Sequence, residues 1–536
     1  MFPPYNHHQA TFVYGPEIYE KLIPEDHILC KINKHVDFSF VNEACKDLYS
    51  QNEGRPVKYK PEIMFRSAIV QYMNDYSDRD MEEAARYNLI IKWFIGIPIE
   101  DHSYDHSILG DFRDRLGENR WKELFFILLK QIEDAGFAKG NQSADATHVI
   151  SNIAIPGTIG LIRQGIKAIM EEIKEVDPKL FEELGGKKTS EKKEKIHTLK
   201  PQEKINKLVD VVEEARTIRG KAEKLESLSV KQKIEQLNQI LNENIEEENG
   251  KIQKKKEHVE DKLVSLVDKD ARHGAKSDSK PFTGYKANLM KSDDGFVTNI
   301  IGTGGNTYDG NILVPLVDEK IENSSKPAKI AGDTHYGSAE NRYQMSQRGI
   351  TIVAPIKEDF NPTGLYSQEK FVLDKTGVTC PAGNRTMISN CNEKEGTIIF
   401  YFKKEICKQC SLKNQCTKQE RRTITIGKHH ELIMEAKEYN KTQAFKEDMK
   451  ERAHIEPKNA EMKRFHGMAR ARYWGLPKVN VQFIITAIVV NVKRLTNVIG
   501  SVCYRATRNC ITNCSNATPS IWSDLTTACV LSNEEV

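Results

Sequence analysis

The sequence has little cysteine and no long apolar run. It holds 11 cysteines among 536 residues, too few for a disulfide scaffold, so a cluster of them indicates metal ligands or buried thiols. Its longest apolar run, residues 481–490, is interrupted by Gln482 and Thr486 and is far shorter than the roughly 18–20 residues of a membrane helix. We therefore expect no membrane span. The first residues also lack the basic and apolar regions of an export signal, which predicts a cytoplasmic protein.

The chain has almost no excess of one charge. Lysine and arginine number 79 against 76 acidic residues, so the net charge of +3 neither indicates nor excludes nucleic-acid binding, and local clusters must decide. With 39% hydrophobic and 29% charged residues the chain has enough apolar material for packed cores. At roughly 100–200 residues per domain, its length predicts three or four structural units.

Several familiar nucleotide and metal motifs are missing. Gly-Thr-Gly-Gly at 302–305 lacks the full spacing of a dinucleotide loop, and Gly-Lys-Lys at 186–188 lacks the glycine and hydroxyl positions of a P-loop. The adjacent histidines at 429–430 cannot share a helix face as a zinc protease motif requires. These absences argue against a nucleotide-binding loop or a zinc protease site of this type.

Residues 1–140 carry a helical pattern throughout. Apolar residues recur at helical spacing from Pro61, Ser77 can cap a second helix, and a third begins near Asp105 or Ser107. Arg113 and Arg115 lie on this third helix, and an apolar helix follows at 121–132. The region is either a helical bundle without a ligand or a helix-turn-helix type of DNA reader.

Alternation of strands and helices begins at residue 142. A strand over the run 142–155 contains Asp145, and an Asp-Gly turn at 292–295 predicts a hairpin between strands 285–291 and 296–302. We then expect a helix at 311–321, a strand at 328–332 ending at Asp333, a helix at 339–347 and a strand at 350–355. This order predicts an α/β fold with a mixed sheet.

Two insertions interrupt the α/β pattern. Residues 157–268 are rich in charge with apolar residues at helical spacing, which predicts a helical insertion, either a solvated arm or a zipper for a partner. Residues 361–430 are rich in turns and contain five cysteines. After them we expect helix at 431–450, a basic helical stretch up to Lys478, a buried helix at 479–495 and a tail without usable periodicity.

Three carboxylates lie where a sheet and the following helix can bring acids together. Asp145 is in the first strand, Asp333 ends a later strand, and Glu456 is near the start of a helix. Oxygen ligands of this kind select Mg²⁺ or Mn²⁺, and two such ions can activate an attacking oxygen on a phosphodiester.

Blocks of sequence around these acids resemble the bacterial insertion-sequence transposases of the DDE type. The blocks are SADATH around Asp145, DARHGAKSDSKPFTGYKA from Asp270, AGDTHYGS around Asp333 and RAHIEPKNAEMK from Arg452. The resemblance extends in order from about residue 54 to residue 495, through GRPVKYKP, WFIGIP and DHSILGDFR to HGMARARYWGLPKV.

This resemblance implies that Asp145, Asp333 and Glu456 are the metal-binding triad of an RNase H-like catalytic core. Arg452 and Lys463 match the arginine and lysine that flank the glutamate in the family's motif, and we expect both to contact DNA. The family places a tyrosine three residues before that arginine, where this chain has Met449. Glu461 competes with Glu456 as the glutamate, but it stands three residues after Lys458, where a surface ion pair is the ordinary explanation.

Two further clusters bear on binding. A stretch without acids interleaves aromatic residues with the basic residues Lys463, Arg464, Arg470, Arg472 and Lys478, and is either a DNA-phosphate surface or a solvated helix face. Four cysteines, Cys380, Cys407, Cys410 and Cys416, suffice for one tetrahedral Zn²⁺, with Cys391 in reserve, although buried free thiols are the alternative.

The sequence thus predicts a DNA transposase that cleaves transposon ends and joins them to target DNA. The expected domains are a helical DNA-binding domain at 1–140, an RNase H-like core at 141–156 and 269–360, a helical insertion at 157–268, a cysteine-containing insertion at 361–430, the glutamate helix region at 431–495 and a tail at 496–536. We expect double-stranded DNA as the partner, Mg²⁺ or Mn²⁺ as the cofactor, a homodimer on DNA, and no membrane, and a structural Zn²⁺ in the cysteine-containing insertion stays open against free thiols. A metal-dependent nuclease without strand transfer and an inactive DNA-binding derivative are the alternatives.

Overall fold

The structure is a computed structural model. It describes residues 15–49, 57–190, 199–248, 250–257, 259–276, 279–356, 363–374, 376–392 and 396–514. The chain divides into two compact units, the first made of residues 1–71, 76–110 and 488–536 and the second of residues 72–75 and 111–487. This division differs from the expected boundary near residue 140, because the helix after residue 110 groups with the second unit and the end of the chain groups with the first.

Short helices make up the first unit. They are α1 Gly15–Leu22, α2 Ile28–His35, α3 Phe40–Ala44, α4 Pro61–Met73, α5 Asp78–Tyr87 and α6 Leu89–Ile95. Ser77 caps α5 as expected, since its hydroxyl accepts from the Asp80 N–H while the Asp80 carboxylate accepts from the Ser77 N–H. The edges and faces of Phe38, Phe65 and Phe94 pack together in the core.

Helix α7 His106–Asp134 contains a break at Gly117, whose φ of 60° and ψ of −179° are not helical. A residue with a Cβ is strained in this conformation, which explains the glycine. The two expected helices, one from about residue 106 and one at 121–132, are therefore confirmed as two segments of α7.

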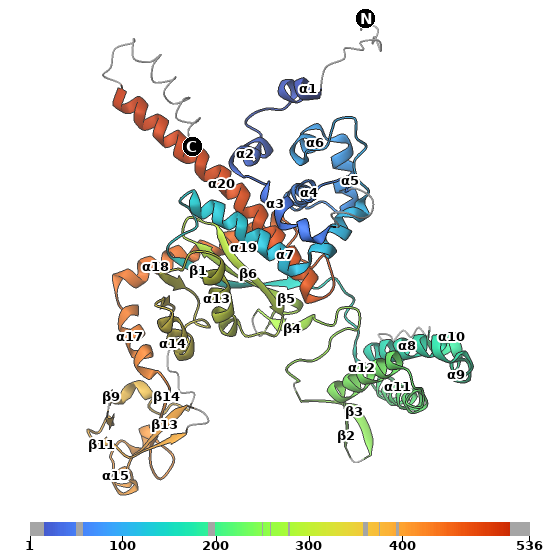
Figure 1. The fold of residues 1–536 in the computed structure, drawn as a ribbon. Helices are drawn as coiled ribbons and strands as arrows, with labels where there is room; N and C mark the ends of the chain where they lie inside the picture. The colour runs from blue at the N-terminus through green and yellow to red at the C-terminus, as the bar shows by residue number, and fades with distance from the viewer. Residues whose placement is uncertain are drawn as a thin grey trace, which may run out of the picture. The chain divides into compact units, whose positions relative to one another are not determined.

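A mixed sheet forms the centre of the second unit (Figure 1). Its strands are β1 Gln142–Ile150, β4 Arg272–Ala275, β5 Pro281–Ser292, β6 Val297–Gly304, β7 Lys329–Ala331 and β8 Thr351–Val353. The order is β4-β5-β1-β7-β8, with β6 also paired to β5. Strands β1, β4, β5 and β6 pair antiparallel, whereas β1, β7 and β8 are parallel. The expected α/β architecture and the hairpin at the Asp-Gly turn are confirmed.

Two helices cover one face of this sheet. They are α13 Leu313–Asn323, which follows the short helix η3 Asp309–Ile312, and α14 Ala339–Gln347. Leu316 and Val317 of α13 share a buried cluster with Ala144 of β1, Ile330 of β7 and Ile352 of β8. The acid-bearing strands are thereby fixed by apolar packing.

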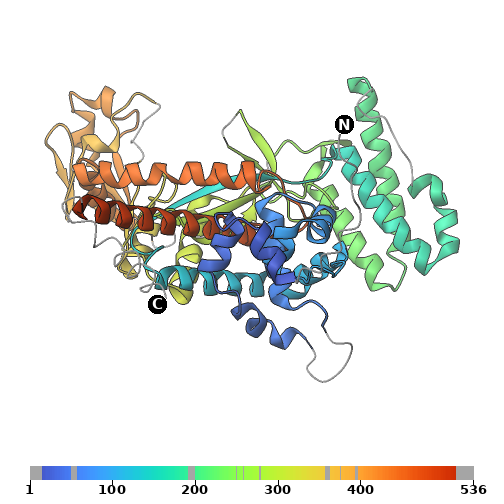
Figure 2. The same cartoon turned by 90° about the horizontal axis from the view of Figure 1, so that it is seen from above.

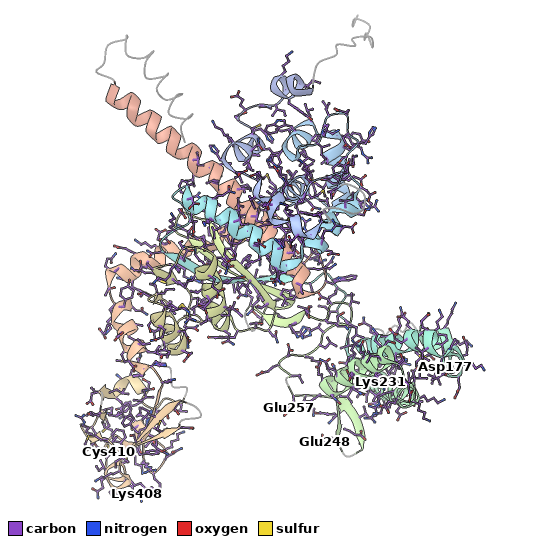
Figure 3. The ribbon with its side chains drawn as sticks, in the orientation of Figure 1. Asp177, Lys231, Glu248, Glu257, Lys408 and Cys410 are labelled. Atoms are coloured by element: carbon purple, nitrogen blue, oxygen red, sulfur yellow. The ribbon has the colours of Figure 1, made fainter. Side chains whose placement is uncertain are left out.

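The insertion after β1 is helical, as expected, and has a core of its own. It contains α8 Thr158–Val176, α9 Pro178–Glu183, α10 Gly186–Ser190, α11 Pro201–Ala222, α12 Leu228–Asn244 and the hairpin β2 Ile245–Glu248 with β3 Lys251–Lys254. Helices α8, α11 and α12 lie side by side (Figures 1 and 2) and bury Ile234, Leu237 and Leu241 among them. Charged side chains of this insertion include Asp177, between α8 and α9, and Lys231 on α12 (Figure 3). Because the apolar residues face one another, the sequence pattern needs no partner zipper.

Two small sheets make up the cysteine-containing insertion. One consists of β9 Val372–Asp374, β10 Gly377–Thr379 and β11 Arg385–Thr386, which follow the short helix η4 Gln368–Lys370. The other consists of β12 Ser389–Asn392, β13 Thr397–Tyr401 and β14 Thr423–Gly427, with the short helices α15 Lys404–Lys408 and α16 Lys413–Cys416. We call residues 363–427 the cysteine module.

The C-terminal helices are α17 His430–Asn440, α18 Gln443–Ala453, α19 Ile455–Phe465 and α20 Leu476–Cys514. The expected helical stretch up to Lys478 is wrong for residues 466–475, which form a non-helical segment whose end is held by distant acids. Asp268 accepts from the Gly475 N–H at 3.0 Å, and Asp270 accepts from the Leu476 N–H at 2.8 Å.

Helix α20 also extends into the region expected to be an irregular tail, whose residues 515–536 lie outside the described residues. Its segment Leu476–Gly500 has the length and composition of a membrane-crossing helix, and 67% of its most apolar window is buried within the structure. Burial of this extent is typical of a core helix.

Candidate active site

Neighbouring parallel strands bring Asp145 and Asp333 together. Gln142 and Ser143 of β1 pair with Ile330 and Ala331 of β7, and this register, continued by two residues, sets Asp145 beside Asp333. Asp333 directly follows β7 in a turn, where its Oδ1 accepts from the His335 N–H at 2.8 Å. The two acids predicted from separate motifs are therefore adjacent.

A third aspartate, Asp309, belongs to the same acidic group. Burial, together with the negative charges of Asp333 and Asp309, raises the pKa of Asp145 to about 6, against the opposing charge of Arg452. Asp309 begins η3, and its Oδ1 is 2.7 Å from Nζ of Lys286 on β5. Sequence reasoning missed Asp309 because a lone aspartate before a short helix has the pattern of an ordinary cap.

Two side chains from the C-terminal helices contact Asp145. Nδ2 of Asn459 in α19 donates to Asp145 Oδ2 at 2.9 Å, and Nη2 of Arg452 in α18 lies 3.7 Å from Asp145 Oδ1. Arg452 was predicted from the spacing of the family's motif, whereas Asn459 had no sequence signal. These contacts place the start of α19 against the strand that carries Asp145.

Glu456 lies in the first turn of α19 and is exposed. Three residues separate it from Asn459, which is about 60° around the helix, so Glu456 is on the flank next to the Asp145 contact. Among the described residues, the side chains that bond or pair with Asp145 are those of Asn459 and Arg452, and Glu456 is not one of them. The structure thus places Glu456 on α19, the helix whose Asn459 contacts Asp145. Among the described residues, Glu456 itself makes no hydrogen bond or ion pair with Asp145.

Glu461 has a different partner. Its Oε2 lies 2.8 Å from Nζ of the buried Lys458, and Oε1 lies 3.9 Å from Nε2 of His466. The ion pair expected between Glu461 and Lys458 is therefore confirmed. Two residues, or about 200° of helix, separate Glu461 from Asn459, so Glu461 points away from Asp145.

Tyr336 is a buried tyrosine beside the acids. Its side chain is 1% exposed, and its hydroxyl has no hydrogen-bond partner within the described part of the chain. Burial raises the pKa of Tyr336 well above its ordinary value, and Asp309, Asp145 and Asp333 raise it further. Its only sequence signal is its place three residues after Asp333.

The predicted DNA-binding residues fall into two groups. Arg115, Arg464 and Arg470 are exposed. Two exposed aromatic side chains, Phe465 (62% exposed) and Trp474 (56% exposed), lie close in the sequence to Arg464 and Arg470. Lys463 is half-buried with Nζ 3.5 Å from His148 Nδ1, and burial together with Lys276 lowers its pKa to about 8.

Two other predicted DNA contacts, Arg113 and Arg472, interact with side chains of the protein itself. Arg113 is 7% exposed and stacks over the Tyr473 ring, 5.3 Å from its centroid. Arg472 pairs with Asp75 and stacks over Tyr72. Because these guanidinium groups pack against protein, the interpretation of Arg113 and Arg472 as free phosphate contacts is corrected.

Within the described part of the chain, one group of potential metal ligands has all its ligand atoms within 4.8 Å of one another, namely Glu82, Asp105 and His106 of the first unit. Glu82 accepts from the His106 N–H and contacts its Nδ1, both at 3.0 Å, and pairs with Arg86, so ion pairing and capping of α7 explain this group. Among the described residues, the ligand atoms of the predicted acids, and those of the predicted cysteines, do not form a group of three within 4.8 Å of one another.

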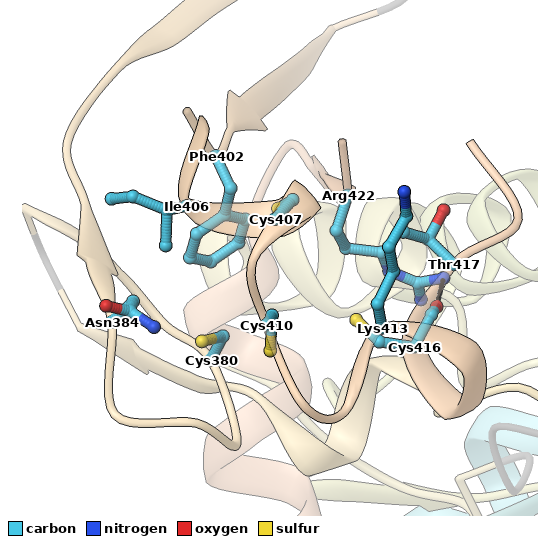
Figure 4. A pocket seen from close by; sticks show the side chains of 10 residues that line it. All are labelled: Cys380, Asn384, Phe402, Ile406, Cys407, Cys410, Lys413, Cys416, Thr417 and Arg422. Carbon is cyan, nitrogen blue, oxygen red and sulfur yellow. Dashed lines mark hydrogen bonds between the residues drawn. The ribbon is translucent and has the colours of Figure 1, made fainter. Parts of the chain in front are cut away.

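The donor set around Asp145 nevertheless fits a hard divalent cation. Asp145, Asp333 and Asp309 are half-buried, and the negative charges of Asp333 and Asp309 raise the pKa of Asp145, which is the situation that a bound cation relieves. Four predicted thiols, those of Cys380, Cys407, Cys410 and Cys416, line one cavity in the cysteine module (Figure 4), whereas Cys391 is exposed on β12.

Comparison with known families matches two parts of the chain. Residues 17–115 match a family described as a transposase domain (DUF772), and residues 379–496 match a family described as a transposase DDE domain. No curated protein and no solved structure matches the chain. DDE transposase domains act on DNA and generally use a divalent metal. The two matches, in the order expected from the sequence, support an insertion-sequence transposase of the DDE type.

Proposed function

We propose that this transposase cleaves DNA at transposon ends and joins the freed ends to target DNA at the acids around Asp145. The observation that carries the proposal is the pairing of β1 with β7, which sets Asp145 beside Asp333. The Arg452 and Asn459 contacts hold the glutamate helix against the same strand. We assign Mg²⁺ or Mn²⁺ to Asp145 and Asp333, with Glu456 as the third ligand.

An RNase H-like core is supported by the order of the strands. Antiparallel β6-β5-β1 continues into parallel β1-β7-β8, and the two aspartates lie on the first strand and directly after β7. The helical insertion separates β1 from β4, and the cysteine module precedes the glutamate helix, in agreement with the expected domain order.

The protein's own groups have distinct tasks in this proposal. Asn459 orients Asp145 through its hydrogen bond, and Arg452 offsets part of the acidic charge. A bound pair of divalent cations would activate the attacking oxygen and stabilise the leaving oxygen of a phosphodiester. Hydrolysis frees a 3′-hydroxyl, which then attacks target DNA, so no covalent protein intermediate is needed.

We assign the DNA surface to exposed residues in the last turn of α19 and in the segment that follows it. Arg464 and Arg470 contact phosphates, and Phe465 and Trp474 provide apolar faces beside them. The N-terminal helices, with Arg115 exposed on α7, recognise the transposon ends. Two ends must be handled together, so we expect a homodimer on double-stranded DNA, working in the cytoplasm on the nucleoid.

Asp333→Asn tests the metal site. This change keeps the shape of the side chain and removes its charge, so we expect metal-dependent cleavage of end DNA to be lost while DNA affinity is kept. Asp318→Asn is the matched control, because Asp318 lies on α13 and pairs with Arg348, away from the proposed ligands. Cleavage by Asp333→Asn at the wild-type rate would refute the assignment.

A second pair of variants tests the choice of glutamate. We expect Glu456→Gln to lose cleavage and Glu461→Gln to keep most of it, because Glu461 is committed to Lys458. The opposite pattern in the same assay would overturn the choice of Glu456.

A nuclease without strand transfer and an inactive DNA-binding derivative are the other candidates. Met449 is the observation that keeps the inactive derivative open, since the family's motif has a tyrosine there. Supplying DNA ends with a preformed 3′-hydroxyl separates a transposase from a nuclease. Joining of these ends to target DNA supports a transposase, whereas cleavage without joining supports a nuclease. An inactive DNA-binding derivative would do neither.

A further inference from the structure

Four thiols from three separate segments meet in the cysteine module. Cys380 follows β10, Cys407 and Cys410 lie at the end of α15, and Cys416 ends α16. All four line the same cavity, and Figure 4 shows their side chains around it. Nothing in the transposition chemistry around Asp145 uses these thiols.

Tight turns carry the first three cysteines. The Cys380 N–H donates to the Asn384 carbonyl and the Gly383 N–H donates to the Cys380 carbonyl, both at 2.8 Å. Gly383 has a φ of 78°, which favours glycine. The Cys410 N–H donates to the Cys407 carbonyl at 3.4 Å, so the two thiols of the Cys-x-x-Cys segment are offered from one turn.

The cysteine module has too small a core to be stable through apolar packing alone. Its buried cluster consists of five side chains, Phe371, Val378, Phe400, Phe402 and Ile424. Modules of fewer than about 70–80 residues commonly need a disulfide or a structural metal in addition to such a core. The structure has free cysteines here, with Cys380, Cys407 and Cys416 packed against the cluster.

The charges around the cavity favour thiolates. Lys413 and Arg422 are the charged side chains that line it, and no carboxylate does. Arg422 also donates to the Cys416 carbonyl at 3.1 Å, which holds its guanidinium beside this cysteine. A site of four thiolates around Zn²⁺ carries two net negative charges, which these two cations offset. Soft sulfur ligands select zinc over the hard cations expected at Asp145.

We propose that Cys380, Cys407, Cys410 and Cys416 bind one structural Zn²⁺. Each thiol gives up its proton to solvent, and four S–Zn bonds replace four S–H bonds without any change of oxidation state. Zinc with Zn–S bonds of about 2.3 Å holds sulfur atoms about 3.8 Å apart. This spacing is tighter than the structure has, so binding draws the turns at Cys380 and Cys407 towards α16.

The first experiment measures metal content in the purified full-length chain. We expect about one zinc per chain in the wild type and in Cys391→Ser, because Cys391 is exposed and does not line the cavity. Cys380→Ser and Cys410→Ser should lose most of the zinc. Wild-type protein without zinc, or equal loss in Cys391→Ser and Cys380→Ser, would overturn the proposal.

A second measurement needs no variant and so does not depend on how well the variants fold. After the zinc is removed with a chelator, Co²⁺ added to the full-length chain should give the sulfur-to-cobalt absorption of a four-thiolate tetrahedral site, and one equivalent of zinc should abolish it. Restored zinc should also protect the cysteine module from limited proteolysis. A cobalt spectrum without thiolate bands would refute the proposal.

The zinc site is independent of the proposed active site. Asp333→Asn should therefore keep one zinc per chain while it loses cleavage. Loss of zinc in Asp333→Asn would contradict two separate sites, whereas cleavage by Asp333→Asn would refute the active-site assignment alone.

Discussion

Replacing Asp145 with asparagine is expected to stabilise the protein while it abolishes cleavage. Asp145 is 18% exposed and lies beside Asp333 and Asp309, so its negative charge is unfavourable in the folded state when no cation is bound. Asparagine has the same shape and no charge. Its side-chain oxygen can still accept the hydrogen bond that Asn459 donates to Asp145.

The magnitude follows from the pKa of Asp145, which is raised from 3.8 to about 6. Each unit corresponds to about 1.4 kcal/mol, so ionising Asp145 costs the folded state at most about 3 kcal/mol. Between pH 4 and pH 6 the folded state binds more protons than the unfolded chain, and the unfolding free energy of the wild type therefore falls as the pH rises. Above about pH 6 the whole penalty is present.

Thermal unfolding in EDTA checks this prediction. At pH 7.5 we expect Asp145→Asn to exceed the wild type by about 1–3 kcal/mol, a rise of a few degrees in Tm, and at pH 4 the difference should vanish. Mg²⁺ should raise the Tm of the wild type more than that of the variant. The control Asp318→Asn, which breaks a surface pair with Arg348, should give no gain. Equal stability of variant and wild type at pH 7.5, or the same difference at both pH values, would refute the reasoning.

Three further predictions concern residues around the acids. Tyr336→Phe removes a buried hydroxyl without a described partner, so we expect unchanged or higher stability, by about 1 kcal/mol, in thermal unfolding; a clear loss of stability would show that the hydroxyl has a structural bond. The pKa of Lys463 is lowered to about 8, so the wild type should lose DNA affinity, by up to roughly ten-fold, between pH 7 and pH 9. Lys463→Arg should keep its affinity over this range. If fluorescence anisotropy gives the same pH dependence for the wild type and the variant, the prediction is contradicted. Arg470→Ala should reduce the slope of log affinity against log salt by about 1, and an unchanged slope would exclude a phosphate contact.

Local patterns predicted much of the catalytic unit. The Asp-Gly turn, the strand around Asp145 and the strand before Asp333 each depend on neighbouring residues, and the structure has them where the sequence indicated. The pairing of β1 with β7 is a long-range contact, but it follows from the ordinary rules for parallel strands.

Other parts of the site depend on contacts that a local pattern does not contain. Asn459 contacts Asp145 across 314 residues of sequence, and Asp309 joins the acidic group from a loop. The non-helical segment 466–475 was interpreted as helix because the acids that hold its end, Asp268 and Asp270, are about two hundred residues away in the chain, at separations of 207 and 206. Arg113 was predicted to face DNA because Tyr473, on which it stacks, is still more remote in the chain.

The helical insertion leaves and re-enters the sheet at one point. Ile150 at the end of β1 and Arg272 at the start of β4 both pair with Gly284, on opposite sides of β5. Two strand spacings, about 10 Å, therefore separate the ends of the insertion. Because so short a gap can be bridged by a few residues, the sheet keeps its register whatever the insertion contains. Relatives of this protein are thus free to lengthen, exchange or lose the helices between these two strands while the geometry of Asp145 stays the same.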